Sequence, residues 1–593
     1  MSTPHPVDAR LREEFVAGNI RQPSVIWEIT TRLRLLGDTH IGAAAPTGVH
    51  AAESDVDLLI DRDPTNGHPR LRATTLAGLL RHHLADHFGR GDKGAEPETV
   101  AHLFGKADIR DDVDAPEAKV AMSPLDLDDA HGELPEHEPV AVRVGNRVQP
   151  DSGAVAPGMF WQTEVLPAGT GFAVTLRLHV TEHADEGRLL ALLALAADGL
   201  SGPEHAPGIQ VGARTGRGFG TVRAETWHAR RHDVRTPQGW ADFFALTWQQ
   251  RWQRAREALA PDTGAGSVIR LRDCLTSALN SGHNAAAEAA RSLATNLAEF
   301  GVDQRARDEL RLSLAVGERP TAAFLPSGDG DTGGDTATRP GLLMVGDTPR
   351  TDDLVQVDRA HRKRPRVTDS GELVSQPLLG DSALFALFKR IGRRLVRELS
   401  GQAHRDDWPA DSPARTWHTR WWGGEPEDAE APKPTPARVR LREAPTVSGT
   451  ELLTTRNTID ALFGDTVDGR LFTDRVHAGG GSQFVLDVRE PDDALRGLLA
   501  LIVRELYTVP MDSLGGGAGV GHGRVAITAA ELVRHGPGGE PVTVDLLAAL
   551  DEPGGRERAQ VEEWLAVLRA QVRPQREQAP DRQRADEKEN ATT

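Results

Sequence analysis

Cysteine and long apolar runs are almost absent from this sequence. Its 593 residues include one cysteine, Cys274, which excludes an intramolecular disulfide and a metal site built from cysteines alone. No apolar run reaches the roughly 18 residues that a membrane-spanning helix needs, and the N-terminus does not read as a signal peptide. We therefore expect a cytoplasmic protein with no membrane partner.

Positive charge is also in deficit. The sequence has 69 Lys and Arg against 87 Asp and Glu, a formal net charge of −18, which argues against a protein that coats nucleic acid over its whole surface. RNA held in a local basic groove stays compatible with this charge, because the acidic residues can lie elsewhere. The chain is too long for one hydrophobic core, so several domains are expected.

Glycine, in contrast, is abundant, and residues 211–222 (VGARTGRGFGTV) concentrate it. Glycine reaches positive φ and allows close approach to a ligand, and exposed N–H groups beside arginines suit phosphate oxygens. Taken alone, such a stretch also fits a hairpin turn. The candidate phosphate-binding residues here are Gly212, Arg214, Gly216, Arg217, Gly218 and Gly220.

A second glycine-rich stretch, residues 514–525 (LGGGAGVGHGRV), repeats the spacing of the first. Gly216, Gly218 and Gly220 match Gly519, Gly521 and Gly523 at one constant offset, and Arg524 adds a cation. A turn has no reason to recur together with its surroundings, whereas a duplicated domain does.

The surroundings do recur in order. Both halves predict an opening strand, a helix, a β-rich insert, a second helix, the glycine-rich loop and a closing strand. This β–α–β…β–α–β order predicts an α+β fold with two tandem ferredoxin-like, RRM-like domains. The matched segments are 26–36 with 310–316, 75–81 with 383–389, 118–120 with 437–439, 145–161 with 456–472, and 187–200 with 495–506.

The composition divides the chain into five parts. A polar extension precedes the first domain, a helical connector joins the two domains, and a polar tail that we expect to be disordered follows the second. The predicted boundaries are 1–23 for the extension, 24–235 for the first domain, 236–304 for the connector, 305–570 for the second domain and 571–593 for the tail.

These landmarks resemble the RAMP superfamily of CRISPR proteins, and most closely two fused backbone subunits of a type III effector complex. The resemblance rests on a strand that ends in HIGAAA (residues 40–45), an aspartate-bearing loop, a helix start, a thumb-like insert and the glycine-rich loop. It implies a subunit that binds guide CRISPR RNA, assembles with other type III subunits, and inserts its thumb into the guide–target duplex. It also implies that a loop aspartate and a divalent metal, Mg²⁺ or Mn²⁺, assist cleavage of target RNA.

Several aspartates are candidates for that catalytic role. In the first half Asp57 is favoured and is the possible metal ligand, because Arg62 and Asp63 follow it at the family's spacing; Asp55 is the fallback. In the second half Asp353 and Asp358 compete on equal terms. Without the resemblance, all of these aspartates would be read as solvated turn residues.

A basic run lies beside the second set of aspartates. It includes Arg362, Lys363 and Arg364, which are either a solvated face or a contact to the RNA backbone. Three functions stay open: a guide-bound target endonuclease, a structural RNA-binding subunit that does not cut, and a guide-precursor nuclease. The last of these would use a histidine such as His40, although His40 fits the end of the opening strand as well.

Overall fold

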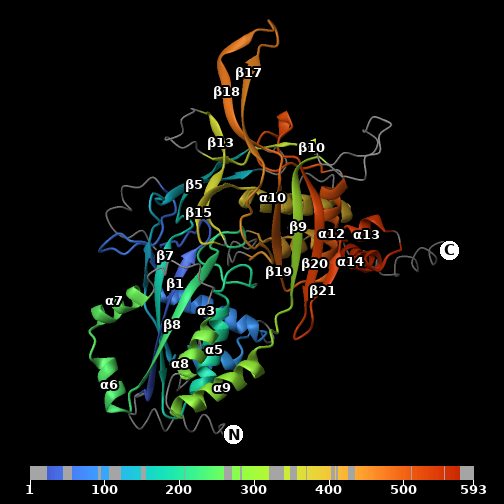
Figure 1. The fold of residues 1–593 in the computed structure, drawn as a ribbon. Coiled ribbons are helices and arrows are strands. Elements are labelled where there is room, and N and C mark those ends of the chain that lie inside the picture. The colour runs from blue at the N-terminus through green and yellow to red at the C-terminus, as the bar shows by residue number, and fades with distance from the viewer. Residues whose placement is uncertain are drawn as a thin grey trace, which may run out of the picture.

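Two mixed α+β halves lie side by side in the computed structural model (Figure 1). The first half is coloured from blue to green and the second from yellow-green to red. The structure describes residues 23–43, 56–90, 95–105, 122–148, 155–205, 207–258, 270–280, 284–318, 339–347, 357–368, 370–402, 408, 412–424, 435–508, 510–552 and 554–573.

The first half is built on an antiparallel sheet in the order β2-β4-β7-β1-β8, with β3 also paired to β7. Alternation of apolar and polar residues along β7 buries every second side chain against the helices, as a sheet with one covered face requires. The strands are β1 (Val25–Leu35), β2 (Arg70–Leu71), β3 (Leu125–Leu127), β4 (Ala130–Glu133), β7 (Gly171–Val180) and β8 (Val222–Asp233).

Helices cover one face of this sheet and share a single apolar core with it. α5 is apolar on nearly all sides because it packs between the sheet and α9. Leu271, Leu275 and Leu293 of the predicted connector belong to the same core, so α8 and α9 are part of the first half, whereas α6 and α7 lie along its outer edge (Figure 1). The helices are α3 (Ala73–His87), α4 (Glu98–Phe104), α5 (Glu186–Asp198), α6 (Pro237–Phe244), α7 (Trp248–Ala258), α8 (Leu271–Asn280) and α9 (Asn284–Phe300).

The second half has its own sheet, ordered β16-β19-β9-β20-β21, with β10 paired to β9, and its own core. Its strands are β9 (Arg307–Glu318), β10 (Arg339–Pro340), β16 (Val439–Leu441), β19 (Gly481–Arg489), β20 (Val525–His535) and β21 (Val542–Asp545). Its helices are α10 (Ser382–Leu399), α11 (Pro413–Trp422), α12 (Asp493–Thr508), α13 (Ala548–Asp551) and α14 (Arg556–Val572).

The strand registers of the two sheets correspond. β8 leaves regular pairing with β1 directly after Ala224, and β20 leaves regular pairing with β9 directly after Ile527, at the third residue of each strand. The registers also correct one sequence match. Leu125 of β3 pairs with Leu178 as Val439 of β16 pairs with Val488, so β3 is the counterpart of β16, whereas residues 118–120 lie outside the described residues.

A long β-hairpin projects from each half. In the first half it is formed by β5 (Ala141–Val148) and β6 (Val155–Val165). In the second half the β17–β18 hairpin stands out from the rest of the molecule (Figure 1), and short strands pair at its base. The strands of this region are β11 (Leu342–Leu343), β12 (Gly346–Asp347), β13 (Arg359–His361), β14 (Lys363–Val367), β15 (Leu373–Pro377), β17 (Thr450–Ile459) and β18 (Thr466–Ala478).

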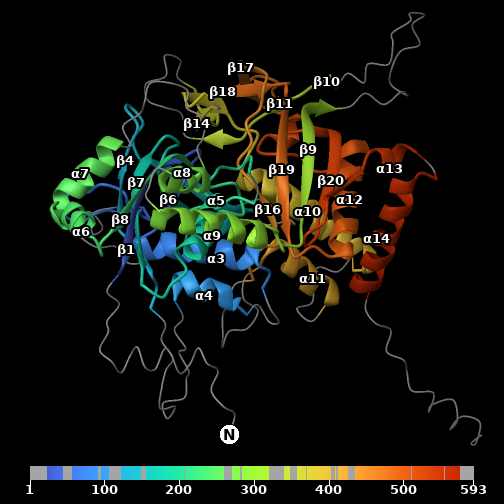
Figure 2. The same ribbon diagram turned by 60° about the horizontal axis from the view of Figure 1, so that its bottom comes forward.

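The two halves lie side by side (Figure 2) and are joined by backbone hydrogen bonds as well as by the chain. The first glycine-rich loop reaches the end of β16 and the segment that follows it: the Leu441 N–H donates to Gly216 O at 2.9 Å, and the Ala444 N–H donates to Gly218 O at 3.2 Å. Among the described residues, none of the helices has the length and apolar character needed to cross a membrane.

Candidate nucleic-acid interface

The two best-placed candidate aspartates hold the bases of the two hairpins in the same way. Asp57 Oδ2 accepts a hydrogen bond of 2.7 Å from the backbone N–H of Gln162 on β6. Asp358 Oδ2 accepts a hydrogen bond of 2.7 Å from the backbone N–H of Thr473 on β18. Each carboxylate is exposed and uses one oxygen for this bond, so the other oxygen of each can face a ligand.

The neighbouring residues repeat the same register. Leu58 lies opposite Thr163 in a parallel bridge, and Arg359 lies opposite Asp474 in the parallel pairing of β13 with β18. Asp358 therefore occupies the position in the second half that Asp57 occupies in the first. Asp55 and Asp353 lie outside the described residues, and their roles stay predictions.

The two glycine-rich loops share one backbone conformation. Four matched pairs have positive φ, and one member of these pairs is not glycine: Arg214, with φ of 60°. A side chain held in this region marks a strained position that tertiary contacts must maintain. The pairs are Gly212 with Gly515, Arg214 with Gly517, Gly218 with Gly521, and Gly220 with Gly523.

The loop amides do not form the open cradle of N–H groups that the sequence suggested. Ala213 N–H donates to His40 O, and its counterpart Gly516 N–H donates to Met344 O, both at 2.8 Å. Val211, Arg217, Gly218 and Gly220 also donate to protein carbonyls in the first loop. These five amides of the first loop are therefore already used within the protein.

Arg214 and Arg217 are the two cationic side chains of the first glycine-rich loop. Burial lowers the pKa of both arginines, and the neighbouring guanidiniums of Arg217 and Arg143 lower the pKa of Arg214 further. Arg214 donates to Thr163 Oγ1 at 3.2 Å, and its guanidinium lies 5.6 Å from the centroid of the Trp161 ring. Within the described part of the chain neither arginine forms an ion pair with a carboxylate, although the negative charge of Asp381 acts on both and partly offsets the lowering of their pKa.

The second loop is more open than the first. Gly519 and Gly521 are exposed, and a Cβ at either position would meet nothing within 4 Å. At Gly218, the counterpart of Gly521, a Cβ would lie 2.3 Å from Ala444 N. The two loops thus share a conformation but differ in surroundings: the first packs on the second half, and the second faces outward with Arg524 exposed beside it.

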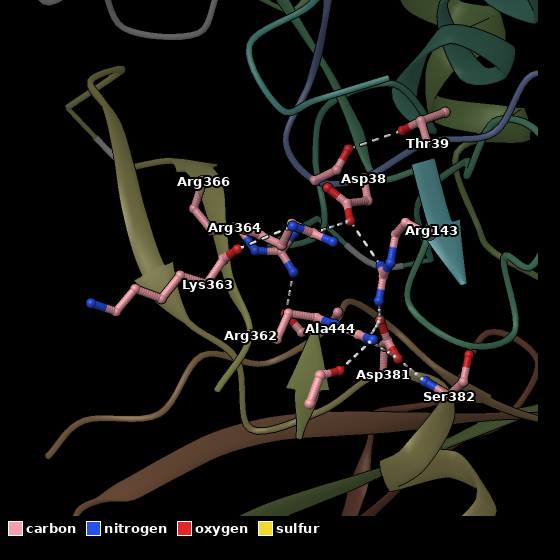
Figure 3. A network of polar contacts seen from close by, with 12 residues as sticks. Asp38, Thr39, Arg143, Arg362, Lys363, Arg364, Arg366, Asp381, Ser382 and Ala444 are labelled. Atoms are coloured by element: carbon pink, nitrogen blue, oxygen red, sulfur yellow. Dashed lines mark hydrogen bonds and ion pairs between the residues drawn. The ribbon is translucent and has the colours of Figure 1, made fainter. Parts of the chain in front are cut away.

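The basic run lies at the junction of the halves, where Arg362 and Arg364 pair with Asp381 and Asp38 (Figure 3). Arg362 Nη1 lies 3.3 Å from Asp381, Lys363 Nζ lies 2.9 Å from Glu451, and Arg364 Nε lies 3.2 Å from Asp38. RNA contact by Arg362, Lys363 and Arg364 stays a prediction, and any such contact would share these cations with the pairs described here.

Arg143 is the centre of this junction. It comes from the first hairpin and pairs with Asp38 of the first half at 2.8 Å and with Asp381 at the start of α10 (Figure 3). All three side chains are buried. Burial raises the pKa of Asp381, but Arg143 and Arg362 lower it by more, so the net pKa lies below its ordinary value and the carboxylate is ionised.

Sequence reasoning did not find this junction, although a signal was present. Asp38 and Asp381 each end the same tetrapeptide, Leu-Leu-Gly-Asp, at residues 35–38 and 378–381. His40, the candidate for a guide-processing nuclease, is buried, with Nδ1 2.7 Å from Glu164 O, and burial lowers its pKa. It joins the opening strand to the hairpin and is not an exposed acid or base.

Comparison with known proteins agrees with these features. No curated protein matches the sequence. Residues 32–223, which run from β1 through the first hairpin to the end of the first glycine-rich loop, match the family model described as the RAMP superfamily. The matched part, within the first half of the chain, is therefore similar to the RAMP superfamily of CRISPR proteins, and this likeness supports an RNA-binding role.

Proposed function

We propose that the chain consists of two RAMP domains in tandem and serves as a guide-RNA-binding backbone subunit of a type III CRISPR effector, which cuts complementary target RNA beside Asp57 and Asp358. The observation that carries this proposal is the identical hydrogen bond by which each aspartate holds the base of a projecting hairpin. The matched β-bulges and the matched φ angles of the loops support the duplication.

Exposed apolar side chains on both hairpins support insertion into an RNA duplex. Phe160 on the first hairpin is 58% exposed, and Leu462 and Phe463 at the turn of the second are each 81% exposed. Such side chains can stack on splayed bases. Arg214 lies against the first hairpin through Thr163 and Trp161, where the backbone of an opened duplex would pass.

The chemistry follows from a carboxylate placed beside a kinked RNA backbone. The 2′-oxygen attacks the adjacent phosphorus and the bond between phosphorus and the 5′-oxygen breaks. The proton of the 2′-hydroxyl passes to the aspartate, and the leaving 5′-oxygen takes a proton from water. The products carry a 2′,3′-cyclic phosphate and a 5′-hydroxyl. A positioned base of this kind contributes about 10²–10⁴-fold to the rate.

A divalent metal fits the donors at these positions. The described residues hold no group of three or more His, Cys, Asp or Glu side chains that could bind an ion alone. Mg²⁺, however, is commonly held by one or two carboxylates together with substrate phosphates, and the second carboxylate oxygen of Asp57 and of Asp358 has no hydrogen bond with any residue that the structure describes. When bound, Mg²⁺ or Mn²⁺ would stabilise charge on the phosphate.

The outward-facing second loop supports assembly with other subunits. Gly216 and Gly218 of the first loop accept hydrogen bonds from Leu441 at the end of β16 and from Ala444 after it, whereas a Cβ at Gly519 or Gly521 would meet nothing within 4 Å. We propose that guide RNA, target RNA and other type III subunits are the partners of this chain.

A structural subunit that binds RNA without cutting it is the second candidate. The observation that favours it is the same hydrogen bond, because a carboxylate that caps a hairpin has a structural reason to be present. The two functions differ in whether target RNA is cleaved.

The test is to load the protein with guide RNA and add end-labelled matching target with Mg²⁺, with Mn²⁺ or with EDTA. The proposal expects two cuts that leave 2′,3′-cyclic phosphates and that are lost when the nucleotides at the cut sites are 2′-deoxy. Tight binding with no cleavage in any metal would favour the structural subunit, and absence of RNA binding would reject both.

A further inference from the structure

The two hairpin bases carry different side chains at matched positions. In the second half, Asp474 on β18 is fully buried, at 0% exposure. Arg359 donates to it through Nε at 2.9 Å and Nη2 at 2.7 Å, and Arg456 donates to it through Nη2. The matched residues of the first half, which follow from the hairpin registers, are Leu58, Thr163 and Gly145.

Two guanidiniums thus share one carboxylate, which leaves an excess of positive charge beside Asp358. Arg359 is 49% exposed and Arg456 is 32% exposed, so their outer nitrogens reach solvent while Asp474 holds their inner nitrogens. Arg456 Nε is buried and has no hydrogen-bond partner among the described residues. Arg359 uses two of its three nitrogens on Asp474, and its Nη1 is not part of that pair.

The first half supplies a cation at the same place from a different element. There, Arg214 of the glycine-rich loop donates to Thr163, the counterpart of Asp474. The position of Arg214 in the second loop is Gly517, which has no side chain to offer. Each hairpin base therefore has guanidinium at this matched position, brought by Arg214 of the loop in one half and by Arg359 and Arg456 of β13 and β17 in the other.

We propose that Arg359 and Arg456, oriented by Asp474, bind the phosphate of target RNA next to Asp358, as Arg214 does next to Asp57. This proposal rests on the proposed function. Guanidinium groups bind phosphate oxygens in a fixed fork geometry, and here they face the non-bridging oxygens on which negative charge grows as the 2′-oxygen attacks. Arg359 and Arg456 contact the substrate, and Asp474 is a positioning residue.

The test compares rates at the two cuts in one guide-loaded protein. Arg359→Gln with Arg456→Gln should slow the cut assigned to Asp358 by about 10- to 100-fold, a typical loss when a charge-stabilising donor is removed, and should leave the other cut unchanged. Arg214→Gln should do the reverse. A charge-matched control, Arg504→Gln with Arg569→Gln on the exposed faces of α12 and α14, should change neither.

A second variant, which also removes the buried carboxylate of Asp474, is the control for misfolding. Arg359→Leu, Asp474→Thr and Arg456→Gln together leave no unpaired charge and take two residues from the first half. This variant should lose the same cut as the double variant. The intact first cut reports that the protein is folded and loaded.

Binding to a 2′-deoxy target supplies a readout that does not depend on cleavage. Loss of two phosphate contacts should reduce the slope of log affinity against log salt by about 0.7–0.9 for each contact. Wild-type rates and an unchanged salt slope in the double variant would overturn phosphate binding by Arg359 and Arg456 and leave the proposed function standing. If the wild-type protein binds RNA but never cuts it, cleavage is rejected, and the salt slope of the double variant alone then tests phosphate binding by Arg359 and Arg456. If the wild-type protein binds no RNA, both proposals are rejected.

Discussion

At the scale of single residues, burial of ionisable side chains sets how the protein responds to acid. Burial lowers the pKa of His83 and His418 to about 3 and, together with the nearby His477, that of His361 to about 4. All three are neutral in the folded state. As the pH falls below 6.5, the unfolded chain binds protons at these positions and the folded chain does not, so stability falls.

We therefore expect the urea midpoint to drop steadily from about pH 7 to pH 5, each histidine contributing up to ~1.4 kcal/mol per pH unit. His418→Gln keeps a donor for Lys389 O, which the histidine ring approaches at 3.2 Å, and removes the titration. This variant should show a shallower acid dependence, measured by urea unfolding across that range. An equal dependence in both proteins would show that His418 does not remain neutral when folded.

Residues also show where sequence reasoning succeeds and where it stops. The spacing of Asp57 to Arg62 and Asp63 was readable from the sequence, but the contact of Asp358 with the hairpin base was not, because it depends on which residue pairs with the hairpin. Similarly, the sequence gives no sign that Arg362 and Arg364 are paired with Asp381 and Asp38. Those partners are distant in sequence and meet only in the folded protein.

At the scale of elements, the hairpin tip should matter to RNA and not to stability. Leu462 and Phe463 are each 81% exposed, so replacing both with serine should leave the thermal midpoint unchanged, as surface substitutions usually do. The same variant should displace target bases less, measured by the fluorescence of 2-aminopurine along the target. Val542→Ser, on the exposed edge strand β21, is the control. Equal fluorescence with the wild-type protein, the tip variant and the Val542→Ser control would show that the hairpin tip does not enter the duplex.

The two glycine-rich loops offer a matched pair of substitutions. Gly218 and Gly521 have φ of 80° and 83°, so alanine strains both backbones by a similar ~1–2 kcal/mol. At Gly218 alone the new Cβ would also lie 2.3 Å from Ala444 N. Gly218→Ala should therefore lower the free energy of unfolding by a further ~1–3 kcal/mol. Equal losses in urea unfolding would mean that the first loop does not pack on the second half as described.

Element order was the part of the fold that the sequence predicted best. Alternation along 172–179 and the apolar run at 187–200 were enough to place β7 and α5. The strand at 125–127 and the inclusion of α8 and α9 in the first core were missed. Both depend on long-range pairing and packing, which a local periodic pattern does not encode.

At the scale of the whole molecule, the buried Arg143 junction should fix the two halves relative to one another. Arg143→Gln removes the cation that Asp38 and Asp381 share and leaves only Arg364 and Arg362 to pair with them, a loss of up to about 3–5 kcal/mol for such buried sites. We expect calorimetry of this variant to resolve two unfolding transitions. The control is Arg177→Gln, because Arg177 pairs with the more exposed Asp126 and Asp128 within the first half, where pairs contribute about 0–1 kcal/mol. Identical single transitions in both variants would contradict a junction role for Arg143.

The central claim is that Asp57 and Asp358 are equivalent and that each directs one cut. The most direct measurement is to map the products of one end-labelled target with wild-type protein, Asp57→Asn and Asp358→Asn. Asparagine keeps an oxygen to accept the hydrogen bond from the hairpin and lacks the charge and basicity of a carboxylate. The account predicts that each variant loses one of two cuts, a different one in each case, by at least about 10²-fold, with target binding unchanged. Two cuts of wild-type intensity in both variants would contradict it.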